Sequence, residues 1–411
     1  MKLCPALLCL TAALLALTAC APADRGVDPA AAPAFVEHIP LEYATQFAVD
    51  RYEDGYLLLT VADGAKYVVV PEGKPAVNLG VDGASVVRRP CGHIYLAGSS
   101  ATDLIIRLGA LDRVKCCSTK AEDYAIPAAR DAIDAGKIRY VGKYSAPEYE
   151  TLLGARCDLA IESTMLYHVP KVREQLERLG VPVVVERSCY ESSPLGRLEW
   201  VKFYAALLGA EEEADAFFAG EKEKLAKLTD RLATSDAAEP DADPNVTGAV
   251  KPKVAFFYLS TNGYVNVRKP GDYLCRIIEL VGGEYAFGSA VEEDSNALST
   301  INIDWEAFYR AAVDADLLVY NSSIDGGMNS VDDLIAKNPL FREFKAVKSG
   351  NVWRANANMY QENSRVVDLI LDFDRVLNGS GPDAADSADP APESPESQPP
   401  RFLTKLERLR D

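Results

Sequence analysis

The stretch that decides the fold runs from Ser192 to Ala233 and reads SSPLGRLEWVKFYAALLG followed by AEEEADAFFAGEKEKLAKLTDRLA. Apolar residues recur through it at helical spacing, and charged residues occupy the other face. This pattern predicts two helices in tandem. The apolar positions are Leu195, Leu198, Val201, Tyr204, Ala205, Leu208, Ala214, Phe217, Phe218, Leu225 and Leu228.

Alternating strands and helices flank this stretch on both sides, an order typical of parallel sheets. Before it, strands are predicted at residues 94–97, 138–141, 158–162 and 181–186, preceded by a hairpin at 56–61 and 66–71. The predicted fold class is α/β, with two Rossmann-like α/β lobes joined by a long helical spine and a ligand cleft between the lobes. The predicted segments are 36–191 (N-terminal lobe), 192–233 (spine), 234–251 (acidic linker), 252–378 (C-terminal lobe), 379–400 (disordered tail) and 401–411 (terminal helix).

Composition limits the partners. The chain has 411 residues, 48% of them hydrophobic, which suffices for two buried cores. Its formal net charge of -18 argues against nucleic acid or an anionic membrane surface as the partner. We expect a monomer that binds no nucleic acid.

The N-terminus is predicted to be a targeting segment. Residues 1–19 combine Lys2, an apolar run and a small-residue cleavage site, as in a signal peptide. Leu17-Thr18-Ala19-Cys20 resembles the bacterial lipoprotein lipobox, which implies that Cys20 is acylated and that residues 20–35 tether the protein to the membrane on its extracytoplasmic face. The alternative is an ordinary signal peptide that contains a cysteine. The remaining cysteines, Cys91, Cys116, Cys117, Cys157, Cys189 and Cys275, form no recognisable framework, and both disulfides and free thiols stay open.

Candidate ligand-binding residues lie in the loops that follow the predicted strands, because ligands of open α/β sheets bind beyond the carboxyl ends of the strands. In the first lobe these are Ser99, Ser100, Met165, Tyr167, His168 and Arg187. In the second they are Asn262, Tyr264, Arg268, Asn358 and Tyr360.

Each group of candidates has a chemical reason and an alternative. The turn at Ser99 and Ser100 suits close approach of backbone N–H groups to a ligand, or simply caps a helix. Tyr, His and Met are axial ligands of haem iron. Tyr167 and His168 could instead cap the helix that opens at Pro170 or stack on an organic ligand. Arg187 and Arg268 suit bidentate contacts to an anionic chelate, or surface ion pairs with partners such as Glu186 or Asp272.

Enzyme signatures are lacking in the sequence. It contains no GxxxxGK[ST], GxSxG or HExxH motif. Its three histidines, His38, His93 and His168, are widely separated, which disfavours a bare zinc or manganese site. We therefore expect no catalysis, no protein metal site and no intrinsic cofactor.

Four motifs together carry a resemblance to a known family. The lipobox, SSPLGRLEW, GDYLCRIIELVGGEYAF and WEAFYRAAVDADLLVYN resemble the solute-binding lipoproteins of ABC importers for iron complexes, siderophores, haem and cobalamin, over residues 36 to 378. The resemblance implies a non-enzymatic, lipid-anchored protein that captures a ferric siderophore-like complex and delivers it to an ABC permease and its ATPase. It also implies that Glu150 and Glu306 dock on the permease; the alternative is that both are ordinary solvated carboxylates. The alternative functions are a haem- or cobalamin-binding protein of the same architecture, or an extracytoplasmic sensor or enzyme on this scaffold.

Overall fold

The structure is a computed structural model that describes residues 32–236, 251–289, 300–323, 327–379 and 400–409. The predicted signal peptide, Cys20, most of the tether, most of the acidic linker and nearly all of the predicted disordered tail lie outside these residues. Within the described part of the chain, no helix combines the length and the apolar character needed to cross a membrane.

The two tandem helices are present as α5 (Pro194–Leu208) and α6 (Glu211–Asp236). Gly209 separates them in a left-handed conformation, with φ of 70°, which glycine adopts without strain. The predicted charged outer face is wrong for α5, because Arg197 and Glu199 are as buried as its apolar residues. The reason is its place in the molecule: α5 packs against α1 of the N-terminal lobe and against α7 and α11 of the C-terminal lobe.

The N-terminal lobe contains a parallel sheet in the order β10-β9-β6-β7-β8. The four strands predicted here are confirmed, whereas β7 and α2 were not predicted. The strands are β6 (Ile94–Leu96), β7 (Val114–Cys117), β8 (Arg139–Tyr140), β9 (Leu159–Ser163) and β10 (Val183–Glu186). The helices are α1 (Thr102–Arg107), α2 (Pro127–Asp134), α3 (Tyr149–Gly154) and α4 (Pro170–Arg178).

A second sheet precedes this one, in the order β1-β2-β3-β4-β5. Its central hairpin, β3 with β4, was predicted and is confirmed as antiparallel. The strands β1, β2 and β5 were not predicted; in FVEHI and FAVDRY, charged or polar residues interrupt the apolar ones. The strands are β1 (Phe35–Ile39), β2 (Phe47–Tyr52), β3 (Leu57–Val61), β4 (Lys66–Val70) and β5 (Ser85–Arg88).

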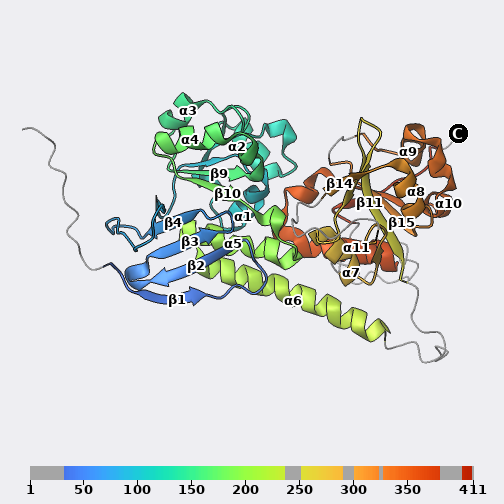
Figure 1. Ribbon diagram of the computed structural model, residues 1–411, viewed down its shortest axis with the longest axis horizontal. Coiled ribbons are helices and arrows are strands. Elements are labelled where there is room, and N and C mark those ends of the chain that lie inside the picture. The colour runs from blue at the N-terminus through green and yellow to red at the C-terminus, as the bar shows by residue number, and fades with distance from the viewer. Residues whose placement is uncertain (1–31, 237–250, 290–299, 324–326, 380–399, 410–411) are drawn as a thin grey trace, which may run out of the picture.

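The C-terminal lobe is built on a mixed sheet in the order β14-β12-β11-β15-β16-β17, with β13 also paired to β11. Figure 1 shows this lobe beside the N-terminal lobe, with α6 running beneath α5 toward the lower right. The strands are β11 (Lys253–Leu259), β12 (Val265–Arg268), β13 (Glu284–Tyr285), β14 (Thr300–Ile303), β15 (Leu317–Tyr320), β16 (Val352–Ala355) and β17 (Leu403–Lys405). The helices are α7 (Tyr273–Leu280), α8 (Trp305–Ala312), α9 (Val331–Lys337), α10 (Lys345–Ser349) and α11 (Val366–Asn378).

Two predictions for this lobe are wrong. Arg268, expected in a loop that follows a strand, lies instead in β12, which pairs with β11 and β14. The predicted terminal helix over 401–411 is instead the strand β17, which extends the sheet antiparallel to β16. The strand prevails because Phe402, Leu403 and Leu406 become buried there, whereas Leu409, which should complete the apolar face of a helix, is 70% exposed.

Candidate functional site

Ser99 and Ser100 lie where the chain leaves β6 and enters α1. The Ser100 hydroxyl donates a hydrogen bond of 2.7 Å to Oε2 of Glu186, a buried residue at the end of β10. No side chain caps this turn or α1 among the described residues. Ser100 therefore ties two neighbouring strand ends together, and the helix-cap alternative is not what the structure shows.

Tyr167 and Arg187 contact each other and two residues next to the strands of the β1–β5 sheet. Arg187 Nη1 donates to the Tyr167 hydroxyl at 2.8 Å, and its Nε and Nη2 donate to Oε1 of Gln46 at 3.2 and 3.1 Å. The Tyr167 hydroxyl in turn donates to Oδ2 of Asp63 at 2.9 Å. Burial, only partly opposed by the hydrogen bond from Arg187, raises the pKa of Tyr167 to about 12. The Tyr167 hydroxyl is therefore protonated at neutral pH. Glu186, the alternative partner considered for Arg187, accepts a hydrogen bond from Ser100 instead.

The other two candidates on this loop are open to solvent. Met165 is 46% exposed and His168 is also exposed. Helix α4 begins at Pro170 without a side-chain cap, so the cap role considered for Tyr167 and His168 is not realised.

Arg268 is buried on β12, contrary to its prediction as a cleft-facing cation. Its Nη1 lies 3.4 Å from Oδ2 of Asp272, and its Nη2 hydrogen-bonds to the Tyr360 hydroxyl. The guanidinium also lies 5.6 Å from the ring centre of Phe256 and 5.3 Å from that of Tyr360. The ion-pair alternative with Asp272 is the arrangement found, although it is buried rather than superficial.

A cavity of about 550 Å³ lies beside Tyr264 at the carboxyl end of β11. Tyr264 is 51% exposed on the β11–β12 turn, which also carries the exposed Asn262. The cavity is lined in addition by Tyr258, Trp305 and Lys337. These three were missed by sequence reasoning because only loops after strands were considered, whereas Tyr258 lies within β11, Trp305 begins α8 and Lys337 ends α9. The sequence offered one signal for this part of the cavity, because a tryptophan directly follows the N-cap residue of α8.

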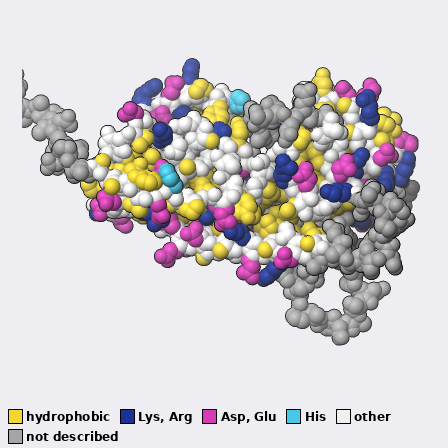
Figure 2. Space-filling view, turned by 60° about the horizontal axis from the view of Figure 1, so that its bottom comes forward, with side chains coloured by type: hydrophobic (Ala, Val, Ile, Leu, Met, Phe, Trp, Pro, Cys, Tyr) yellow, Lys and Arg dark blue, Asp and Glu magenta, His cyan; other side chains and the backbone are white. Residues whose placement is uncertain are grey.

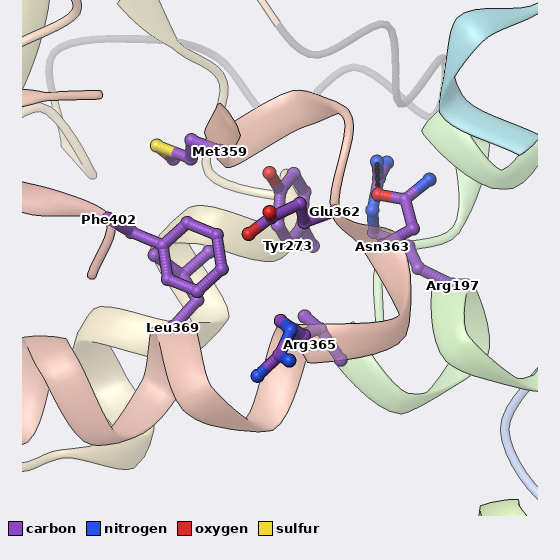
Figure 3. A pocket seen from close by; sticks show the side chains of 9 residues that line it. Arg197, Tyr273, Met359, Glu362, Asn363, Arg365, Leu369 and Phe402 are labelled. Carbon is purple, nitrogen blue, oxygen red and sulfur yellow. Dashed lines mark hydrogen bonds between the residues drawn. The ribbon is translucent and has the colours of Figure 1, made fainter. Parts of the chain in front are cut away.

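Asn358 and Tyr360 belong to the segment that leaves β16. Asn358 donates from Nδ2 to Oε2 of Glu362 at 2.9 Å, and its buried Oδ1 has no hydrogen-bond partner in the described part of the chain. A cavity of only about 10 Å³ lies next to this segment, between Arg197 and the start of α11 (Figure 3). That volume holds about one water molecule, so an organic ligand does not fit there.

Metal-ligating side chains do not gather in the described residues: His, Cys, Asp and Glu form no group of three or more that could hold an ion. The six cysteines left open by the sequence are all unpaired thiols, and all but Cys189 are buried.

The two proposed docking carboxylates lie on different lobes. Glu150 is exposed in the first turn of α3, and Glu306 is exposed in the first turn of α8, where it pairs with Arg310 at 2.8 Å. On the face shown in Figure 2, acidic and basic side chains are interspersed rather than gathered by sign.

The chain is similar to a protein family, to a lipoprotein and to several solved structures. The family described as periplasmic binding protein matches residues 94–359. An uncharacterised lipoprotein of Methanocaldococcus jannaschii is 26% identical over 349 residues, which cover 82% of each chain. Among solved structures, a periplasmic haem-binding protein from Pseudomonas aeruginosa superposes with a TM-score of 0.53 at 19% identity, covering 70% of this chain and 93% of its own. A periplasmic binding protein from Veillonella parvula gives a TM-score of 0.53 at 18% identity, covering 70% and 91%.

Proposed function

This chain belongs to the periplasmic binding protein family, and from that premise we propose that it is the lipid-anchored solute-binding protein of an ABC importer. It captures an iron complex or a similar macrocycle between its lobes and delivers the ligand to a permease and its ATPase. The acylated Cys20 holds it at the extracytoplasmic face of the membrane. Its role is binding and not catalysis.

The observation that supports this proposal is the cavity of about 550 Å³ beside Tyr264, which is lined by residues of the C-terminal lobe and would form that lobe's side of the binding site. Its volume lies within the range typical of small-molecule sites, about 300–1,000 Å³. It opens at the carboxyl end of β11, where ligands of open α/β sheets bind. Its aromatic side chains, Tyr258, Tyr264 and Trp305, supply the apolar contact area that a large organic ligand needs, and Lys337 adds a cation.

A specific observation favours a haem- or corrinoid-like ligand over an anionic ferric chelate. Both arginines predicted to bind an anion already have partners, Arg187 with Gln46 and Tyr167 and Arg268 with Asp272 and Tyr360. Neither arginine lines the cavity beside Tyr264, so an anionic chelate bound there would have neither guanidinium as a partner. A macrocycle held by aromatic contacts needs neither guanidinium.

Native mass spectrometry of the protein purified from its own host tests the proposal directly. We expect a bound mass that corresponds to an organic iron complex or a tetrapyrrole, with a visible absorption band in the tetrapyrrole case. Titration of the purified protein with haemin, cyanocobalamin and a panel of ferric siderophores should then identify a ligand whose affinity falls in Tyr264→Ala.

The control for this titration is Phe35→Ala, which removes a comparably exposed aromatic side chain from β1, far from the cavity in sequence. Phe35→Ala should bind the identified ligand with the same affinity as the wild type. A protein that carries no such mass and binds none of these compounds contradicts the proposed function.

A further inference from the structure

Four consecutive residues of the C-terminal lobe, Gln361 to Ser364, lie against the N-terminal lobe. We call them the seam segment; they connect Tyr360 to the start of α11. Gln361 makes two hydrogen bonds to the backbone after α1 and β7: its Oε1 accepts from the N–H of Ala125 at 2.8 Å, and its Nε2 donates to the carbonyl of Asp123 at 2.9 Å. The side-chain amide of Gln361 thus accepts one backbone hydrogen bond and donates another, as a peptide group of a neighbouring strand does.

Asn363 continues the contact at a buried position. Its Nδ2 donates to the carbonyl of Ser100 at 2.9 Å, and its Oδ1 accepts from Nη2 of Arg197 at 3.1 Å. Arg197, on the spine helix α5, also donates to the carbonyl of Ser188 at 3.1 Å and stacks 4.2 Å from the ring centre of Tyr273. Figure 3 shows Arg197, Asn363 and Tyr273 side by side. One guanidinium therefore touches both lobes.

Ser364 completes the set, since its N–H donates to Oδ2 of Asp103 on α1 at 2.9 Å. Asp103, Arg197, Asn363 and Ser364 are all under 10% exposed. If the lobes separated at the seam, these polar groups would exchange their hydrogen bonds within the protein for hydrogen bonds to water, and each such exchange carries a modest net cost. The seam is therefore resistant to opening, and the stiff helix α5 lies alongside it.

We infer that the seam segment is a positioning clip that fixes the angle between the lobes before any ligand arrives. The ligand then meets two walls that are already in place, and Tyr360, the residue next to the clip, is held with them. The benefit for binding rests on the proposed function, whereas the clip itself is a property of the ligand-free protein and is tested without ligand.

Amide hydrogen exchange of Ala125 gives the first test, because this N–H donates to Gln361 across the seam. Gln361 is only partly buried, so its variants should fold. In Gln361→Ala we expect the Ala125 amide to exchange about tenfold faster, as the loss of one hydrogen bond predicts. The matched control is Arg276→Ala, which removes an exposed side chain that pairs with Glu279 on α7, inside the C-terminal lobe. Equal exchange at Ala125 in wild type and Gln361→Ala overturns the inference.

The distance between the lobes gives the second test. Spin labels attached through unnatural amino acids at Leu153 on α3 and Arg310 on α8, both exposed, avoid the native cysteines. In the ligand-free protein we expect one narrow distance distribution, which broadens in Gln361→Ala combined with Asn363→Ala and stays narrow in Arg276→Ala. Gln361→Glu, which keeps the shape but loses the donor to Asp123, replaces the double variant if the latter does not fold.

An unchanged distance distribution in the folded variants shows that the spine helix alone sets the angle between the lobes. That result overturns the inferred role of the seam segment. Failure of the proposed function is distinguishable, since a protein that binds none of the compounds tested would still show both effects.

Discussion

At the scale of single residues, Glu162 on β9 is a buried carboxyl group. It is 0% exposed, and neither of its oxygens has a hydrogen-bond partner among the described residues. Tyr95 on β6 and Tyr149 on α3 are the ionisable groups that interact with it. Burial raises the pKa of Glu162 from 4.5 to about 8, so the group is mostly protonated in the folded protein at neutral pH.

This pKa predicts a particular pH dependence of stability. The folded state keeps the proton up to about pH 8, whereas the unfolded chain releases it near 4.5, so the free energy of unfolding falls as the pH rises between these values. We expect Glu162→Gln, which is neutral and of similar shape, to remove this fall, worth up to about 1.4 kcal/mol per pH unit. Urea denaturation from pH 5 to 8 measures it, with the exposed Glu150→Gln as control. Parallel pH profiles for Glu162→Gln and wild type would refute the assignment.

At the scale of elements, two buried carboxylates fasten the segment before β2 to α5. Glu199 accepts the N–H groups of Glu42, Tyr43 and Ala44 at 2.8–3.1 Å, and Glu191 accepts those of Thr45 and Gln46. Gly196 permits this approach, since a Cβ there would lie 2.9 Å from the Tyr43 carbonyl oxygen. Burial opposes ionisation of Glu199, but the N–H donors and Lys202 outweigh it and the pKa is lowered.

Glu199→Gln should therefore destabilise the protein by roughly 1.5–3 kcal/mol, the usual worth of hydrogen bonds to a charged group. Because the pKa of Glu199 is lowered in the folded state, its contribution is present above the unfolded pKa and is lost as the pH falls below it. The difference between variant and wild type should shrink in acid, as urea denaturation at pH 7 and pH 3 can show. Glu223→Gln, on the exposed face of α6, is the control, and an equal effect of both variants would argue against the clamp.

The strand β17 is the second element with a testable role. The Phe402 side chain is 1% exposed and its N–H donates to Oδ2 of Asp372 at 2.7 Å, while Arg401 forms two bonds to Glu362 at 2.5 and 2.6 Å. Phe402→Ala should lower the free energy of unfolding by about 3–5 kcal/mol. Leu409→Ala, at a 70% exposed position, should change it little. Equal denaturation midpoints for the two variants would show that β17 contributes nothing to stability.

At the scale of the whole molecule, the proposed delivery to a permease depends on both lobes at once. Reversing Glu150 and Glu306 together to lysine should abolish ligand uptake in cells and leave ligand affinity in vitro unchanged, because both side chains are exposed and neither lines the cavity, although Glu306 directly follows the lining residue Trp305. Uptake assays and calorimetry on the same double variant measure the two quantities. A loss of affinity parallel to the loss of uptake would place these residues in ligand binding instead.

The sequence by itself determined the two lobes, the tandem helices and most central strands, because apolar periodicity and strand-to-helix alternation are local properties of the chain. It also pointed to Tyr264, which lines the cavity. Only the tertiary structure decided the partners of the charged side chains: Arg187 binds Gln46, 141 positions away, and Arg197 binds Asn363, 166 positions away. No local pattern encodes such pairings. The same holds for residues 401–409, whose apolar spacing suits a helix but whose state was decided by the open edge of β16, since pairing there satisfies backbone groups and buries Phe402.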